Sequence, residues 1–414
     1  MKKTSIALLA IFLMISSTAI AASEYEKPPV LKASQILPAD LFSGPHHRLD
    51  NKVRNDGVIN TYTMRSTFGQ FKVTSTALLR IRVHELKAIA AMEAVKGTDE
   101  YSQSAKEAGD DIVEGGKALI TKPTATVKGA VTGVGKLFER AHESLFESQP
   151  SKYEDSRTKA LIGFSKTKRD YAKEFGVDVY SSNPVLQEHL DDISWAGYAG
   201  GMSVSVVSAA IPGGAGLVVS AAGGADLLNE AIAVTPPSEL RIQAREKLTA
   251  MKINEDLIDL FINNSSFSPR HQTLIVAALE KMPETADRGL FIKYAVPTDS
   301  EVVALFNQQI AQLQAGYYQH MDKIEQFILI GGLIASRSST GKLIVAAPLD
   351  YVIWNKNTER IFQAFDDYAK GTAGIKGKEW WLTGSLSPMI HEKLKANGWQ
   401  LHEQSEKRLL KKAP

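Results

Sequence analysis

The spacing of apolar residues along the chain is mostly that of helices. After Ser75, whose hydroxyl suits an N-cap, apolar side chains recur near helical spacing up to Lys96, and Gly97 is expected to end this helix. The same periodicity recurs further along the chain. We expect additional helices over residues 100–114, 151–175 and 184–195, several within 238–315, and one over 358–370.

β-Type patterns are confined to short stretches near the two ends. Residues 58–74, rich in Thr, Tyr, Phe and Val, predict a hairpin that turns near Ser66–Gly69. Two apolar runs over 327–335 and 343–347 predict another hairpin, with its turn in Ser336–Lys342. The β content is therefore expected to be small.

The end of the chain predicts a strand, a helix and a returning strand. Glu379–Leu382 has strand composition, and Trp399–His402 is expected to return beside it. Between them, Ser387 suits an N-cap, Pro388 suits the first helical position, and Gly398 is expected to follow the end of the helix.

These elements together predict an α+β protein that is mainly α with small β elements. A helical body is expected to contain a Gly/Ala-rich helical hairpin, and a small C-terminal α/β unit follows it. The expected parts are a signal peptide over 1–21, an extended arm over 22–57, a hairpin plus helices over 58–150, helices with the Gly/Ala-rich hairpin over 151–234, a helical domain over 235–326 and the C-terminal α/β unit over 327–414.

The first residues have the three parts of a secretory signal peptide. Met1–Lys3 is a short basic start, Ile6–Ile15 is an apolar core, and Ala19–Ala21 fits the small-x-small cleavage pattern. We expect a mature chain that starts near Ala22 and is found in the bacterial periplasm or secreted. The alternative is an uncleaved anchor, but the apolar stretch is shorter than the roughly 20 residues of a membrane span.

Charge and cysteine content exclude several classes of protein. The 414 residues include 48 Lys and Arg against 46 Asp and Glu, and removal of Lys2 and Lys3 with the leader leaves the two signs equal. A chain without net charge has no global field to attract nucleic acid, so no nucleic-acid partner is expected. The absence of Cys excludes disulfide bonds and a lipid anchor on Cys.

No complete catalytic or cofactor motif occurs in the chain. It lacks a Gly-x-Ser-x-Gly elbow, a His-Glu-x-x-His helix and a phosphate loop, so no cofactor is expected. His46 and His47, with Asp50, form the one local cluster of metal-ligand types. Because adjacent residues in extended chain point in opposite directions, a polar loop is favoured and no metal is expected.

Residues 115–138 carry Lys but no acidic residue, and a helix is expected from Thr124 to Phe138 after the break at Pro123. Its Val residues form an apolar stripe with Lys towards the other face, which suits a lipid surface. Lys128–Val134 resembles one copy of the lipid-binding repeats of synucleins and perilipins. This resemblance implies similar physical behaviour at a lipid surface and does not imply that the chain belongs to either family. Docking on the protein's own core is the alternative. The membrane-contact candidates are Val127, Lys128, Val131, Val134, Lys136 and Phe138.

Residues 196–225 carry no charge, and 16 of these 30 residues are Gly or Ala. Small residues at every fourth position line one helix face and allow close packing of two helices, so the segment predicts a helical hairpin divided at Pro212–Gly214. The hairpin is either buried in the fold or inserted in a membrane, and its composition resembles that of pore-forming colicins. The predicted packing residues are Gly197, Gly201, Ser205, Ala209, Gly216, Ser220 and Gly224.

We therefore expect an exported bacterial envelope protein without enzymatic activity that binds a membrane surface or another envelope protein. One alternative is a secreted effector that inserts into membranes in the manner of a pore-forming protein. The other is an enzyme whose site is assembled from distant residues. The residues considered for that site are His46, His47, His84 and Trp381.

Overall fold

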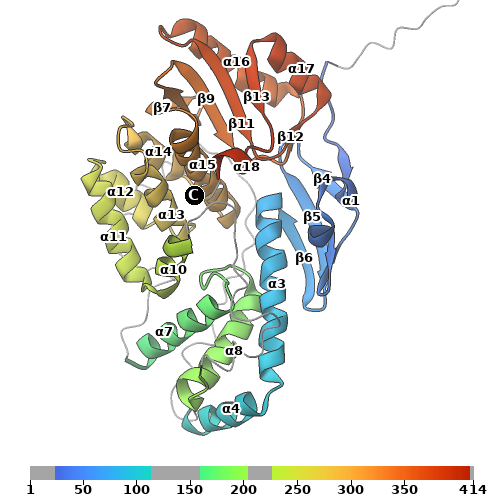
Figure 1. Ribbon diagram of the computed structural model, residues 1–414, viewed down its shortest axis with the longest axis vertical. Coiled ribbons are helices and arrows are strands. Elements are labelled where there is room, and N and C mark those ends of the chain that lie inside the picture. Colours follow the sequence, from blue (N-terminus) through green and yellow to red (C-terminus); the bar gives the residue numbers. More distant parts are fainter. Residues whose placement is uncertain (1–23, 113–158, 204–225, 411–414) are drawn as a thin grey trace, which may run out of the picture.

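The computed structural model describes residues 24–112, 159–203 and 226–410 (Figure 1). The predicted signal peptide over 1–21, the stripe over 124–138 and the hairpin residues from 204 to 225 lie outside the described residues. In the described part, a long helix stands between an N-terminal sheet and a group of helices, and a second sheet lies at the C-terminal end (Figure 1).

The N-terminal sheet has six strands, all joined by antiparallel pairing. β5 pairs with β6 along one edge and with β4 and β3 along the other. The short helices α1 (Ala33–Ile36) and α2 (Ala39–Phe42) lie between its first strands. The strands are β1 (Val30–Lys32), β2 (Ser43–Gly44), β3 (His47–Leu49), β4 (Lys52–Asn55), β5 (Asn60–Ser66) and β6 (Gly69–Thr74).

Helix α3 (Thr76–Lys96) covers one face of this sheet. The Ser75 hydroxyl accepts a hydrogen bond from the Leu78 N–H at 3.2 Å, and Gly97 follows the last helical residue, as the sequence predicts. Inward strand side chains, among them Tyr62 and Met64, are fully buried against α3. Burial of this apolar face stabilises the sheet, whose strands are individually too short to be stable.

Two groups of helices follow α3. In the first, α8 (Pro184–Gly200) packs against α3, α4 (Asp99–Ile112) and α7 (Lys159–Glu174). In the second, α13 packs on α11 and α15, and α12 packs on α11 and α14. This second group comprises α10 (Asp226–Val234), α11 (Pro237–Ala250), α12 (Glu255–Ile262), α13 (Pro269–Glu280), α14 (Arg288–Ala295) and α15 (Glu301–His320).

The C-terminal sheet has five strands in the order β13-β11-β9-β8-β7. The β7–β8–β9 part is antiparallel, whereas β9, β11 and β13 are parallel because helices connect them. Small elements β10 (Tyr351–Val352), β12 (Ser385–Leu386) and α18 (Glu406–Leu409) complete the unit. Its main elements are β7 (Ile324–Ile330), β8 (Leu333–Ser338), β9 (Lys342–Ala347), α16 (Lys356–Gly371), β11 (Gly377–Leu382), α17 (Pro388–Ala396) and β13 (Trp399–His402).

Helices cover both faces of this second sheet. Trp381 lies in the core shared with α15, whereas its neighbour Trp380 lies in the core shared with α16 and α17. Consecutive residues of a strand point to opposite faces, so the Trp pair serves two separate cores. The predicted strand–helix–strand end is confirmed, with the Ser387 hydroxyl accepting from the Ile390 N–H.

The expectation of a mainly α protein with small β elements is wrong, because the structure contains one six-stranded and one five-stranded sheet. Residues expected in the extended arm, 22–57, include strands β1 to β4. The turn predicted in Ser336–Lys342 is present at residues 339–341, where it joins the antiparallel strands β8 and β9. The apolar run over 327–335 is not one strand, because it turns back at Gly331–Gly332 between β7 and β8. Strands of two to four residues carry too little alternation to be recognised, and the partners that stabilise them are remote in sequence.

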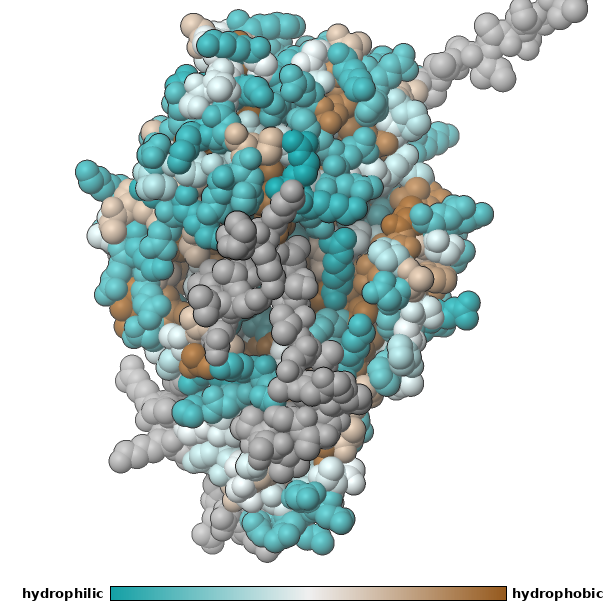
Figure 2. All heavy atoms as spheres, viewed as in Figure 1, coloured by the Kyte–Doolittle hydropathy of each residue, from teal (hydrophilic) through white to brown (hydrophobic). Residues whose placement is uncertain are grey.

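No helix within the described ranges has both the length and the apolar character required to cross a membrane. Figure 2 shows one side of the molecule, on which hydrophobic residues form small patches within a mainly hydrophilic surface. The large apolar side chains that are exposed belong to different elements. They are Val30, Ile36, Tyr198, Val234, Ile242, Val303 and Met321.

Candidate functional site

In the structure, the side chains of His46, His47 and Asp50, which the sequence groups as possible metal ligands, each have a different partner. His47 is buried, and its Nε2 donates to the Leu41 carbonyl oxygen at 3.2 Å. His46 lies near the Phe68 ring, with 6.3 Å between ring centroids, and Asp50 binds Arg65 at 2.8 Å. Burial lowers the pKa of His47, which keeps the imidazole neutral. Across the described ranges, no three His, Asp or Glu side chains are grouped as a metal site.

The two other residues considered for an enzyme lie in different parts of the fold. His84 on α3 donates from Nε2 to the Gly176 carbonyl oxygen at 3.1 Å, and burial lowers its pKa to about 4. Trp381 is fully buried in the C-terminal sheet and donates from Nε1 to Glu379 at 2.9 Å. His84 therefore lies on α3 and Trp381 in the C-terminal sheet, and each donates to a partner other than His46 or His47.

Two of the predicted hairpin-packing residues lie within the described part of the chain. A Cβ at Gly197 would lie 2.3 Å from the Tyr171 hydroxyl, so the missing side chain allows α7 to approach α8. Gly201 instead follows the end of α8 with a φ of 72°, the left-handed conformation that terminates helices. Gly201 thus lies one position beyond α8, which ends at Gly200, while the remaining predicted packing residues lie outside the described ranges.

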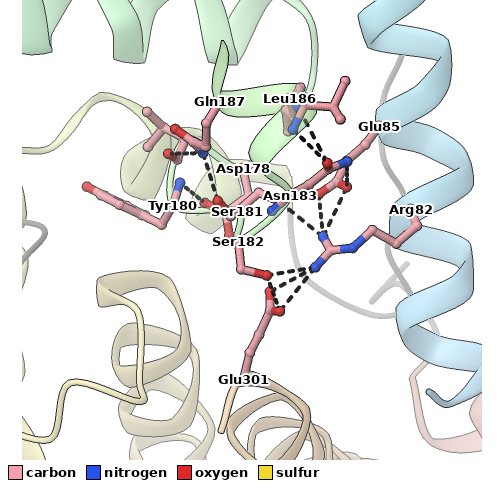
Figure 3. A network of polar contacts seen from close by, with 12 residues as sticks. Arg82, Glu85, Asp178, Tyr180, Ser181, Ser182, Asn183, Leu186, Gln187 and Glu301 are labelled. Atoms are coloured by element: carbon pink, nitrogen blue, oxygen red, sulfur yellow. Dashed lines mark hydrogen bonds and ion pairs between the residues drawn. The ribbon is translucent and has the colours of Figure 1, made fainter. Parts of the chain in front are cut away.

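A buried ionic network, which sequence reasoning missed, joins α3 to α15 (Figure 3). The Arg82 guanidinium lies 2.9 Å from the Glu85 carboxylate and 3.0 Å from the Glu301 carboxylate. Arg82 and Glu85 are buried, whereas Glu301 is partly exposed at the first turn of α15. Burial alone lowers the pKa of Arg82, but the two carboxylates raise it above its usual value, so the guanidinium stays charged.

The loop before α8 completes this network (Figure 3). The Ser181 hydroxyl and the Asn183 side-chain amide both donate to Glu85, at 2.5 and 2.9 Å. The Asn183 side-chain oxygen also accepts from the Val185 N–H at 3.1 Å, which caps α8. The Ser182 hydroxyl donates to Glu301. Because every charged group has hydrogen-bonding partners, the network fixes α3, α8 and α15 relative to one another.

A second buried polar cluster surrounds Glu379 on β11, under α15. Its carboxylate accepts from Lys342 Nζ at 2.6 Å, from Trp381 Nε1 at 2.9 Å and from the Tyr317 hydroxyl at 3.3 Å. His402 stacks on Trp381 with 3.8 Å between ring centroids. Three donors satisfy one carboxylate in this arrangement, which indicates a structural role in the sheet.

Two surface hollows occur near these elements. One, of about 490 Å³, is lined by polar residues of α16 from Lys356 to Gln363. The other, of about 230 Å³, lies between the N-terminal sheet and α15 and includes Ser75, Val302 and Phe306. Neither hollow is lined by the histidines or the tryptophan that the sequence suggests for an enzyme.

Comparison with known proteins gives no assignment. No family model, curated protein or solved structure matches the chain.

Proposed function

We propose that this chain is an exported bacterial envelope protein that binds a membrane surface and is not an enzyme. The observation that carries the proposal is the apolar and basic stripe of residues 124–138. Val127, Val131 and Val134 repeat at helical spacing, and Lys128 lies towards the other face. Its three Gly residues each weaken an isolated helix by about 1 kcal/mol, so such a helix gains order from an apolar surface.

The surroundings of this segment in the described structure support a binding role. The stripe over 124–138 lies in the sequence between the end of α4 at Ile112 and the start of α7 at Lys159, and the Gly/Ala-rich segment continues beyond the end of α8 at Gly200. Both predicted segments are therefore connected to the unit formed by α4, α7 and α8. The start of α7 adjoins the end of α8, since a Cβ at Gly163 would lie 2.6 Å from the Tyr198 ring. Tyr198 is 37% exposed there. A partly exposed Tyr is typical of membrane–water interfaces.

Co-sedimentation with liposomes, combined with thermal melting, tests the proposed function. We expect the mature protein to sediment with anionic vesicles and Val131→Asp to abolish this binding without lowering Tm, because a carboxylate would then face the acyl chains. Lys128→Gln with Lys136→Gln should weaken binding only to anionic vesicles. Absence of binding by the parent protein, together with a large fall in Tm for Val131→Asp, would instead favour a helix docked on the core.

A membrane-inserting effector remains the second candidate, because residues 196–225 combine small residues with the absence of charge. Release of a dye from the same vesicles separates the two functions. Binding without release supports a surface protein, and release at low protein-to-lipid ratios supports insertion. The partner-binding form of the proposal predicts neither effect and instead predicts co-purification with one envelope protein.

A further inference from the structure

The outer face of the N-terminal sheet, which points away from α3, is strongly basic. On β4, Val53 is buried against α3 while Lys52 and Arg54 on either side of it are exposed. The same alternation and the strand register place four more basic residues on this outer face. We call these residues the basic face: Lys32, Arg48, Lys52, Arg54, Arg65 and Lys72, all exposed.

The arrangement of charges on the basic face is unfavourable for the isolated sheet. Lys32 lies directly opposite Lys52, and Arg48 lies directly opposite Arg65. Like charges at opposite positions of neighbouring strands destabilise a sheet. None of the six strands contains Asp or Glu, and the ion pair that the described residues form with this face joins Arg65 to Asp50. The remaining positive charge is therefore open to an external anion.

The face is broad and carries an exposed apolar residue at its edge. Val30 on β1 lies opposite Arg54 and is 60% exposed. The outward strand positions hold no aromatic side chain, since Tyr62 and Phe71 pack on the α3 side. Binding surfaces for single-stranded nucleic acid combine basic residues with aromatic rings on which bases stack. A basic face with Val at its edge fits lipid headgroups and the upper acyl region better.

We propose that the basic face docks the protein on an anionic bilayer surface through the lipid phosphate groups. This inference rests on the proposed function and names a surface for it. The sheet and α8 pack on α3 from different sides (Figure 1), and the basic face shares no residue with the stripe over 124–138. The two contacts can therefore be removed independently.

The test compares two triple variants of the mature protein. Lys52→Gln, Arg54→Gln and Lys72→Gln remove half of the basic face. Lys356→Gln, Lys370→Gln and Lys395→Gln remove the same charge from exposed positions on α16 and α17. Both are titrated with vesicles of phosphatidylcholine containing phosphatidylglycerol, and with vesicles of phosphatidylcholine alone. Each basic residue near an anionic surface contributes about fivefold in affinity, so the first triple should lose about a hundredfold and the control little.

Further outcomes separate this inference from the proposed function. Parent binding should weaken as ionic strength rises from about 0.1 M to about 1 M, because the Debye length shortens from about 10 Å to about 3 Å. If both triple variants lose the same vesicle affinity, or if the Lys52/Arg54/Lys72 triple binds as well as the parent, the basic face is not the docking surface. Either result leaves the proposed membrane binding of the protein standing. No vesicle binding by the parent overturns both. Binding of the parent to a DNA oligonucleotide, lost only in the first triple, would assign the face to nucleic acid and overturn lipid docking.

Discussion

Arg82 and Glu301 form an ion pair with a separation of 3.0 Å although they are 219 positions apart in the sequence. The pair links α3, which supports the N-terminal sheet, to α15, which supports the C-terminal sheet. Glu85 shares the same guanidinium. This network is therefore one of the links between the two sheets, beside direct hydrogen bonds such as those from the Asn60 and Thr76 N–H groups to Asp350.

This geometry predicts different effects for the two carboxylates. Glu85→Ala leaves the buried Arg82 without its closest anion, and such loss typically costs about 3–5 kcal/mol. Glu301→Ala should cost about 1 kcal/mol or less, because the Glu301 side chain is 31% exposed and Arg82 keeps Glu85. Urea denaturation of both variants measures the difference, with Asp299→Asn as the exposed control. Equal losses for Glu85→Ala and Glu301→Ala would contradict the arrangement.

A second prediction concerns stability against acid. His271 caps α13, where its Nδ1 accepts from the Ser268 N–H at 3.3 Å, so a protonated ring cannot take this role. Burial lowers its pKa to about 4, below the ordinary value of 6.5. Between these values only the unfolded chain binds the proton, so the free energy of unfolding falls as pH falls from about 6.5 to about 4, by about 3 kcal/mol at most.

The variant His271→Gln tests the assignment, because Gln can also accept from the N-cap N–H but does not titrate. Its free energy of unfolding should depend less on pH in this interval than that of the parent. His84, with its pKa also lowered to about 4, should contribute to the slope that remains, as should His47 and His402, whose pKa values burial also lowers. Parallel pH profiles for the parent and the variant would show that His271 is not the titrating group.

Local signals predicted the parts of the fold that local residues determine. Ser75, Ser387 and Gly398 mark helix ends correctly because capping depends on a few neighbouring residues. The sheet over β1 to β4 was missed because its pairs join short strands whose outer residues are polar. Lys32 and Lys52, for example, are separated by 20 positions and repel one another, so no local pattern predicts their pairing.

In the candidate site, too, features that depend on neighbouring residues are visible in the sequence, and features that depend on remote residues are not. The spacing of three between Arg82 and Glu85 on one helix is visible in the sequence and is the only available signal for the ionic network. The contribution of Glu301 is not visible, because it depends on how α15 packs. His46 and His47 are adjacent residues with metal-ligand side chains. The alternation of side chains in β3 points His47 towards the core, where it is buried.

A third prediction concerns coupling between Lys342 and Glu379, whose side-chain atoms are 2.6 Å apart. Lys342→Met removes the cation from a buried carboxylate and should cost about 1–2 kcal/mol, because the Lys342 side chain is 37% exposed and Glu379 keeps its Trp381 and Tyr317 donors. Glu379→Gln in the same chain should restore part of this loss, because the amide needs no counter-charge. A double-mutant cycle should give a coupling energy above about 1 kcal/mol. Additive losses would show that the two groups act independently.

The last prediction concerns the contact between α8 and α4. A Cβ at Gly200 would lie 1.9 Å from the backbone oxygen of Ser104, and backbone cannot rotate away as a side chain can. Gly200→Ala should therefore separate the two helices and cost about 3 kcal/mol, at the upper end for overpacking, despite the better helix propensity of Ala. Gly371→Ala is the matched control at the end of α16, since nothing lies within 4 Å of its Cβ position. If the denaturation midpoint of Gly200→Ala equals that of the parent, α4 and α8 do not approach this closely. If stability falls in Gly200→Ala and not in Gly371→Ala, small residues of α8 pack within the protein body.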